Sequence, residues 1–319
     1  MKIVITGAAG FVGSALSLKA LAAGHHVYGI DGVLNNLYPN DQKLINIAKL
    51  SQNNNFNFLE ADLRKADFSN FIVGADIVVH CAAMPGLDLS WENFELYESC
   101  NLTATNRLLH QLDLKNISKF IFISTSSVYG KLALGDENSP IKPISPYGVT
   151  KAAAEMLIHA SAGITGLPFV ILRLFSVYGP GQRADMAYHK LIKLMILNKE
   201  ISIYGDGNQS RSNTYIDDVT TAILLAITKG KIGETYNIGG NEDISLNHAL
   251  RTMAEITNIS PILKFLPPKN GDQLKTKAIF LKAQQDLNYA PVTPFSVGLR
   301  NQILWLEGLY NTTQPTTKQ

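Results

Sequence analysis

Short runs of apolar and β-branched residues alternate with longer segments of helical pattern over the first half of the chain. The apolar runs predict buried strands, because a parallel sheet that is covered on both faces needs strands that are apolar throughout. The alternation itself predicts an α/β fold with a doubly wound parallel sheet. The predicted strands are 2–6, 26–30, 56–60, 76–80, 119–124 and 168–173, and the predicted helices are 11–23, 40–51, 92–112 and 146–163.

This alternation stops after Arg173, where glycine, proline and asparagine become frequent, as in YGPGQ, YGDGNQ, IGGN and PPKNGD. One hydrophobic core rarely organises more than roughly 250–300 residues, and the chain has 319. We therefore expect a Rossmann domain over 1–174 and a second, smaller α/β lobe over 175–319. We also expect the segment 211–238 to return and pack on the sheet.

The charge of the chain is nearly balanced, with 28 basic and 26 acidic residues and a net charge of +2. A nucleic-acid partner is not expected, because it requires a concentrated basic face. The opening MKIVITG is typical of a strand rather than a secretory leader, and no apolar stretch is long enough to span a bilayer. The two cysteines, Cys81 and Cys100, cannot form a disulfide framework. These features predict a cytoplasmic protein without a membrane partner.

Three glycines follow the first predicted strand and open the first predicted helix, in TGAAGFVG. Gly7 permits a tight turn, Gly10 lets the backbone approach a pyrophosphate, and Gly13 allows the helix to pack closely on the strand. The N–H groups and partial positive charge at the start of a helix also suit phosphates. The turn, which includes Phe11 and Val12, therefore predicts a dinucleotide site.

Two predicted strands end in a carboxylate. Asp31 can accept hydrogen bonds from both ribose hydroxyls and would repel a 2′-phosphate. Since no arginine or lysine occurs between 31 and 42, NAD is favoured over NADP. Asp62, in EADL, has two interpretations: it contacts the adenine amino group, or it is the N-cap of a helix that begins at Leu63.

Tyr147 and Lys151 occur in SPYGVTK at the start of a predicted helix, where a spacing of four places both side chains on one face. A free tyrosine, with a pKa of about 10, is a poor base at neutral pH. A neighbouring ammonium lowers that pKa and prepares the phenol for general-base catalysis. The hydroxyls of residues 124–127 end the fifth strand, at the edge where open α/β sheets bind ligands. The alternative is a surface tyrosine beside a solvated lysine.

Together these motifs resemble those of the extended short-chain dehydrogenase/reductases, specifically the NAD-dependent nucleotide-sugar epimerases and dehydratases. The resemblance covers essentially the whole chain. Its carriers are TGAAGFVG (6–13), HCAA (80–83), ISTSSVYG (123–130), YGVTK (147–151), LRLFSVYGPGQR (172–183), YGDGNQSR (204–211), TYIDDV (214–219) and YNIG (236–239). It implies an enzyme with bound NAD in which Tyr147 is the base, Lys151 tunes it and Thr125 assists.

The resemblance also implies the other contacts and partners. The cofactor contacts would include Leu63, Ala82, Ala83, Asn101, Phe175 and Val177, in addition to the glycine turn, the two strand-end acids, Tyr147 and Lys151. A homodimer is expected, because family members often pair through two long helices, and a role in polysaccharide biosynthesis is implied. No metal is expected, since the seven histidines show no metal-ligand spacing.

Within the family, the residues after Thr125 separate the activities. The 4,6-dehydratases carry an Asp-Glu pair there, whereas this chain has Ser126 and Ser127, neither of which can act as a carboxylic acid. The run SVYGPGQRADMA (176–187) resembles the UDP-glucuronate 4-epimerases, in which Ser176 and Arg183 would face the sugar carboxylate. Arg183 could instead bind a nucleotide phosphate or the backbone of the lobe.

Three further residues are assigned to the substrate by resemblance. Ser126 would contact the sugar, Arg211 would grip the diphosphate through its planar fork, and Asp272 would hold the nucleotide ribose. The expected function is an NAD-dependent nucleotide-sugar 4-epimerase that forms a transient 4-keto intermediate, with UDP-glucuronate as the first choice of substrate. The alternatives are a UDP-glucose or UDP-N-acetylglucosamine epimerase, a reductase or decarboxylase of the same family, and a non-catalytic NAD-binding scaffold.

Overall fold

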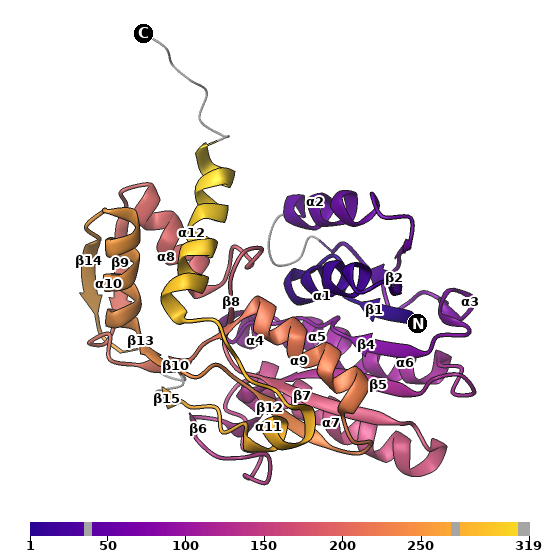
Figure 1. The fold of residues 1–319 in the computed structure, drawn as a ribbon. Coiled ribbons are helices and arrows are strands. Elements are labelled where there is room, and N and C mark those ends of the chain that lie inside the picture. Colours follow the sequence, from indigo (N-terminus) through magenta and orange to yellow (C-terminus); the bar gives the residue numbers. More distant parts are fainter. Residues whose placement is uncertain (35–39, 269–274, 312–319) are drawn as a thin grey trace.

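A seven-stranded parallel sheet forms the centre of the molecule (Figure 1). The computed structural model describes residues 1–34, 40–268 and 275–311. The strand order is β12-β7-β5-β4-β1-β2-β3, and all neighbours run parallel. The strands are β1 (Lys2–Thr6), β2 (His26–Asp31), β3 (Phe56–Glu60), β4 (Ile77–His80), β5 (Lys119–Thr125), β7 (Phe169–Leu174) and β12 (Thr235–Ile238). The predicted doubly wound α/β fold is confirmed.

Successive residues of each strand contribute to cores on opposite faces of this sheet, which explains why the strands are apolar throughout. In β1, Ile3 and Ile5 belong to one core and Val4 belongs to the other. The first core is covered by α1 (Phe11–Ala22), α9 (Ile216–Lys229) and α11 (Leu281–Leu287). The second core is covered by α3 (Ser69–Ile72), α6 (Ala104–Gln111) and α7 (Pro146–Thr165). Helix α2 (Asp41–Leu50) packs on α1.

Helix α7 begins and ends at residues suited to those positions. The hydroxyl of Ser145 accepts a hydrogen bond from the N–H of Gly148 at 3.1 Å, and Pro146 occupies the first turn. At the other end, Gly166 adopts a left-handed conformation with φ of 73°. These signals explain why this 20-residue helix lies close to its predicted range of 146–163.

The helix predicted over 92–112 is divided into several pieces. Helix α4 (Asp88–Glu92) ends at Asn93, whose φ of −139° and ψ of 60° are not helical. Helix α5 (Phe94–Glu98) then runs into a π-helical turn, η1 (Ser99–Thr103), before α6 begins. Short π-helical turns of this kind often mark functional sites.

A third core organises most of the chain after β7. It includes residues of α8 (Ala187–Ile196), α10 (Leu246–Thr257) and α12 (Phe295–Asn311). Short strands accompany it: β6 (Leu132–Ala133), β8 (Val177–Tyr178), β9 (Glu200–Tyr204), β10 (Ser210–Ser212), β11 (Thr214–Tyr215), β13 (Asp243–Ser245), β14 (Ile262–Leu266) and β15 (Lys275–Thr276). A four-stranded sheet has the order β13-β10-β15-β6, so it joins segments that are distant in the chain.

Segments cross between the two parts of the molecule in both directions. Strand β6 lies in the chain before β7 but pairs with β15 in the small sheet. Helix α9 and strand β12 return to the large sheet, and helix α11 packs against both of them. No described helix is long and apolar enough to cross a membrane.

Candidate active site

A cavity of roughly 530 Å³ opens where the large sheet meets the later part of the chain. It lies at the carboxyl ends of the parallel strands, where β1 and β4 are neighbours and the connections leave the sheet in opposite directions. Open α/β sheets bind ligands at such a switch point. The predicted site residues that line it are Gly7, Gly10, Phe11, Val12, Gly13, Asp31, Asp62, Leu63, Ala82, Ala83, Thr125, Ser126, Tyr147, Lys151, Phe175, Ser176, Val177, Arg183 and Arg211.

The glycine turn brings bare backbone to the wall of this cavity. Gly7 has a φ of 69°, and a Cβ there would lie 2.8 Å from the backbone nitrogen of Ala82, at the end of β4. A Cβ on Gly13 would lie 2.1 Å from the carbonyl oxygen of Gly7. Gly10 caps α1 with its backbone alone, and the first turn of α1 holds no acidic residue. The start of the helix therefore offers its N–H groups and partial positive charge to an anion.

The carboxylate of Asp31 is held at the end of β2 by three donors. The N–H groups of Ala9 and Val33 donate to it at 3.2 and 2.9 Å, and Lys43 donates to Oδ1 at 3.2 Å. Lys43 lies on α2, just beyond the window in which the sequence shows no cation. Sequence reasoning missed this lysine, because only the fold of α2 over α1 brings it back to the strand end.

Asp62 lines the cavity, but its carboxylate is engaged by Arg64. The Arg64 side chain donates to both oxygens, at 2.7 Å from Nη2 to Oδ2, and the backbone N–H of Arg64 donates at 3.0 Å. The hydrogen bond to the Arg64 side chain is the main cause that lowers the pKa of Asp62. Asp62 therefore caps a turn, because no helix begins at Leu63, and its contact with adenine stays a prediction.

Asn101 does not line the cavity. It is 1% exposed on the π-helical turn, and its amide oxygen accepts from the N–H of Met84 at 2.6 Å. Its amide nitrogen donates to the carbonyl of Met84 and to the Thr150 hydroxyl, both at 3.0 Å. Both ends of the amide are satisfied by protein, so Asn101 fastens the segment after β4 to α7. The predicted contact of Asn101 with NAD stays a prediction.

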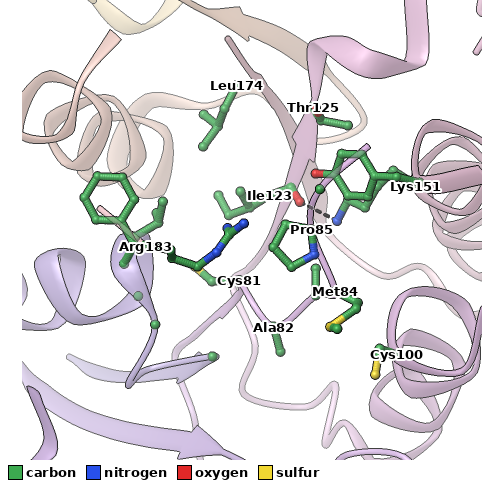
Figure 2. A pocket seen from close by; sticks show the side chains of 18 of the residues that line it. Cys81, Ala82, Met84, Pro85, Cys100, Ile123, Thr125, Lys151, Leu174 and Arg183 are labelled. Carbon is green, nitrogen blue, oxygen red and sulfur yellow. Dashed lines mark hydrogen bonds between the residues drawn. The ribbon is translucent and has the colours of Figure 1, made fainter. Parts of the chain in front are cut away.

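Thr125, Tyr147 and Lys151 meet on one side of the cavity. Thr125 ends β5, while Tyr147 and Lys151 lie one turn apart at the start of α7. The Lys151 ammonium donates to the carbonyl of Ile123 at 2.7 Å (Figure 2) and lies 4.0 Å from the centre of the Phe122 ring. The structure therefore brings together the three residues to which the sequence assigns the chemistry.

The surroundings shift the pKa values of this pair in opposite directions. Burial raises the pKa of Tyr147, although the hydrogen bond with Thr125 and the charge of Arg183 lower it in part. Burial also lowers the pKa of Lys151 to about 7. The ammonium of Lys151, which could stabilise the phenolate of Tyr147, thus lies one helical turn away. Burial, however, disfavours the charged form of this lysine.

The opposite wall carries the residues predicted to contact the sugar nucleotide. Phe175 is fully buried and lines the wall, with its ring centre 6.5 Å from that of Tyr129 and tilted relative to it, and Ser176 and Val177 follow it along the lining. Arg211 reaches the lining from β10, where its Nη1 donates to the carbonyl of Ser210 at 3.0 Å. Asp272 lies outside the described residues, so its predicted contact with the nucleotide ribose stays a prediction.

Arg183 projects into the cavity from the wall that faces Thr125 and Lys151 (Figure 2). Its Nε and Nη2 donate to the two oxygens of Asp185 at 2.9 and 2.7 Å. Asp185 also lines the cavity, and sequence reasoning missed it. The signal was present as a carboxylate two residues after the arginine, but the pairing depends on the turn that precedes α8.

The described part of the chain shows neither a candidate metal site nor a disulfide. Its residues contain no group of three or more histidine, cysteine, aspartate or glutamate side chains that could hold a metal ion. Both described cysteines, Cys81 and Cys100, are free thiols, and both line the cavity.

Comparisons with known proteins place this site in a family. The model described as "NAD dependent epimerase/dehydratase family" matches residues 3–239. The uncharacterised UDP-glucose epimerase YtcB of Bacillus subtilis is 42% identical over 314 residues, which are 97% of this chain and 99% of the relative. The UDP-glucuronate 4-epimerase of Thermodesulfobacterium geofontis is 32% identical over 310 residues, which are 95% of each chain.

A solved structure matches over nearly the whole fold. The crystal structure of UDP-glucuronic acid 4-epimerase from Bacillus cereus, in complex with UDP-glucuronic acid and NAD, aligns with a TM-score of 0.94 at 40% sequence identity. The alignment covers 97% of this chain and 100% of that chain. This chain belongs to the NAD-dependent epimerase/dehydratase family, and the predicted family is confirmed.

The cofactor of this family member is NAD, as predicted from the sequence, and the residues present fit it. The absence of a side chain at Gly7, Gly10 and Gly13 lets the backbone beside the start of α1 approach a pyrophosphate. The carboxylate of Asp31 stands at the end of β2, where ribose hydroxyls can donate to it.

Proposed function

We propose that this enzyme is a UDP-glucuronate 4-epimerase. The observation that carries the proposal is the position of Arg183, whose guanidinium enters the same cavity as Tyr147 and whose charge acts on the phenol of Tyr147. A guanidinium at that place suits a sugar that carries a carboxylate, because arginine binds carboxylates through paired hydrogen bonds. The names of the relatives from Thermodesulfobacterium geofontis and Bacillus cereus support the same substrate.

In this proposal the glycine turn and Asp31 would hold NAD, which would supply the acceptor and then the donor of the C4 hydride. Tyr147 takes the proton of the C4 hydroxyl and gives it back after the 4-keto intermediate has turned over in the cavity. Thr125 holds the same oxygen through its hydroxyl. Lys151 supplies the positive charge that stabilises the phenolate of Tyr147 and so lets it form near neutral pH.

Water elimination is not part of the proposal, because the wall lacks an acid where the dehydratases have one. Ser126 and Ser127 follow Thr125 and are 6% and 9% exposed, with hydroxyls as their only side-chain polar groups. A hydroxyl cannot replace a carboxylic acid as a proton donor at neutral pH. The reaction therefore ends with the epimer rather than with a dehydrated sugar.

Arg183 has a second task in this proposal. The 4-keto intermediate of a glucuronate is a β-keto acid, which loses CO2 when the bond to its carboxylate stands perpendicular to the ketone. Hydrogen bonds from Arg183 and Ser176 would hold the carboxylate in another orientation. We expect Arg183→Ala to release more pentose product than the wild type and to epimerise more slowly. Arg251→Ala, on the outer face of α10, serves as the matched control.

The decisive test incubates the enzyme with UDP-glucuronate, UDP-glucose and UDP-N-acetylglucosamine in turn, with catalytic NAD, and resolves the products by NMR. We expect UDP-galacturonate from UDP-glucuronate, at a kcat/KM above that for either neutral sugar. Net accumulation of NADH would contradict an epimerase, since the hydride must return to the sugar in every turnover.

UDP-glucose is the second candidate substrate. The bidentate pair with Asp185 neutralises Arg183 within the protein and so removes part of the advantage of an anionic sugar. YtcB, the relative at 42% identity, carries the name of a UDP-glucose epimerase. Faster epimerisation of UDP-glucose than of UDP-glucuronate in the same assay would select this candidate.

We also propose the division of labour within the chain and its homodimer. Residues 1–174, with the returning α9 and β12, hold NAD, and most of the remainder grips the nucleotide sugar.

The dimer would form through α4, α5 and α7, where Trp91, Phe94, Val149 and Met156 are 47–67% exposed. Light scattering should report a dimer that Met156→Glu weakens. Ile232→Glu, at a residue 63% exposed after α9, should leave it intact.

A further inference from the structure

A buried ion pair lies directly behind the catalytic lysine and takes no part in the mechanism described so far. Glu155 on α7 and Arg173 on β7 are 2% and 5% exposed. Nη2 of Arg173 donates to Oε2 of Glu155 at 2.7 Å, and Nε donates to Oε1 at 3.1 Å. The hydroxyl of Ser124, next to Thr125, donates to Oε1 as well. With these donors, Glu155 is held as a carboxylate.

The arginine of this pair is itself fixed by the sheet. Its Nη1 donates to the hydroxyl of Tyr129 at 2.8 Å, and that hydroxyl donates to Oδ1 of Asn237 at 2.7 Å. Asn237 lies on β12, the strand contributed by the returning segment. The charge of Arg173 therefore has no freedom to leave Glu155, because neighbouring elements hold its fork in place.

Glu155 lies one helical turn after Lys151 on α7, on the same face. The partners of the Lys151 ammonium, the carbonyl of Ile123 and the ring of Phe122, are neutral. Burial lowers the pKa of Lys151, and the negative charge of Glu155 raises it in part, which leaves it at about 7. Without Glu155, more of this lysine would be uncharged at neutral pH.

Apart from Glu155, the titratable groups packed against Lys151 from β4 and α7 are neutral, and Arg183, the cation on the opposite wall of the cavity, is paired with Asp185. From the end of β4, His80 is neutral because burial lowers its pKa to about 3. Cys81 is a neutral thiol because burial raises its pKa to about 12. From α7, Tyr147 is a neutral phenol until it reacts. Among the described groups that face Lys151, Glu155 thus supplies the ionised carboxylate.

We propose that Glu155 is a positioning residue of catalysis, which keeps Lys151 charged and is itself kept ionised by Arg173. The proposal rests on the roles proposed for Tyr147 and Lys151, but not on the identity of the sugar. It gives the network that runs from α7 to β12 a function in the reaction as well as in the fold.

The reason this charge matters is that Tyr147 and Lys151 titrate together. When the pair has lost one proton, it is either phenolate with ammonium, which can act as a base, or phenol with neutral amine, which cannot. These two forms contain the same number of protons, so pH does not change their ratio. The carboxylate of Glu155 favours the first form by stabilising the ammonium.

The test measures the charge of Lys151 directly in the NAD-bound enzyme without sugar. The ¹³Cε signal of Lys151, assigned by its loss in Lys151→Met, is followed by NMR against pH. In the wild type we expect Lys151 to titrate with a pKa of about 7, so that much of it is still protonated at neutral pH. In Glu155→Gln we expect its titration to move down by at least about one pH unit, whereas Glu200→Gln, a carboxylate exposed on β9, should leave it unmoved.

Activity gives a second readout that a structural role would not produce. Because Lys151 releases its proton earlier in Glu155→Gln, the rate at high pH should fall while the apparent pKa of the acid limb decreases. Glu155→Asp should restore much of both. A loss of rate with an unchanged pH profile, or a Lys151 titration equal to that of the wild type, would overturn the proposal.

If Glu155→Gln does not fold because it leaves Arg173 unpaired, the double variant with Arg173→Gln removes both buried charges together. It should show the same downward shift of the Lys151 titration. The wild-type titration is itself a test: a Lys151 that loses its proton below neutral pH in the NAD-bound enzyme refutes the proposal. Absence of epimerase activity on every sugar would refute the proposed function and leave these titrations interpretable.

Discussion

The two ends of the active-site cavity are built in different ways. At the cofactor end, the lining comes from loops that follow β1, β2 and β4, and its decisive feature is bare backbone at Gly7 and Gly13. At the sugar end, the lining comes from separate segments, and its decisive features are single charged side chains such as Arg183 and Arg211. One end is defined by shape and the other by a few placed charges.

This difference teaches where each end is vulnerable. A change in the glycine turn collides with main chain, which cannot move aside without disturbing the sheet. A change at Arg183 or Asp185 alters charge in a half-buried wall and leaves the backbone in place. We therefore expect substitutions at the cofactor end to weaken NAD binding and lower the stability of the fold. Substitutions at the sugar end should instead change the selectivity between substrates.

The largest expected effect lies between the two ends. Tyr147→Phe removes the hydroxyl that we propose takes the C4 proton, so we expect epimerisation to fall roughly 10²–10⁴-fold, while NAD binding is retained. NMR of the products and calorimetric titration with NAD measure the two quantities. Tyr28→Phe, on β2 away from the cavity, is the control. A Tyr147→Phe enzyme with wild-type turnover would show that another group takes the proton.

The next effect tests the cofactor end by shape alone. Gly13→Ala places a Cβ 2.1 Å from the carbonyl oxygen of Gly7. We expect it to lower the free energy of unfolding by about 1–3 kcal/mol, and to weaken NAD binding. Gly163→Ala on α7, where a Cβ would meet nothing within 4 Å, should instead stabilise the helix. Urea unfolding that does not separate these two variants would contradict the steric account.

A smaller effect tests the sugar end by charge alone. Asp185→Asn removes the carboxylate that pairs with Arg183. It thereby also removes the repulsion between Asp185 and a sugar carboxylate. We expect the ratio of kcat/KM for UDP-glucuronate to that for UDP-glucose to rise several-fold. Asp217→Asn, on the exposed face of α9, should not change the ratio. An unchanged ratio in Asp185→Asn would mean that this pair does not contribute to selectivity.

The last prediction concerns stability against pH. The pKa of Lys151 is about 7 in the folded protein, below its ordinary 10.5, so between these values the unfolded chain binds more protons. The free energy of unfolding should therefore rise with pH across this window. Lys151→Met should flatten that rise, as measured by thermal unfolding of the NAD-free protein. Equal slopes in both proteins would assign the pH dependence to other groups.

Local pattern predicted the large sheet well. Each of the six predicted strands lies within one residue of its observed bounds, because a strand buried on both faces is apolar throughout. The helix predicted over 92–112 was wrong in its continuity. Its interruption at Asn93 and the π-helical turn at Ser99–Thr103 depend on contacts with α7 and with the segment after β4.

The same distinction holds for the candidate site, where residues close together in the sequence could be paired and residues brought together by the fold could not. Tyr147 and Lys151 could be paired from their spacing alone, since four residues make one turn of a helix. Two ion pairs of the site could not be predicted, namely Lys43 with Asp31 and Arg183 with Asp185. Each pairing depends on how a segment turns back to the cavity. The contacts of Asn101 with Met84 and Thr150 likewise depend on the fold, and its assignment to NAD stays a prediction.

By itself, the sequence determined the fold class, the glycine turn and the Tyr147–Lys151 pair, because these depend on periodicity and on residues close together in the chain. Only the tertiary structure decided which charges meet. Glu155 and Arg173 are 18 residues apart in the chain, yet they pair behind Lys151. Their pairing requires β7 to lie beside β5 and under α7. Burial then sets the strength of those charges, and burial is a property of the whole packed molecule.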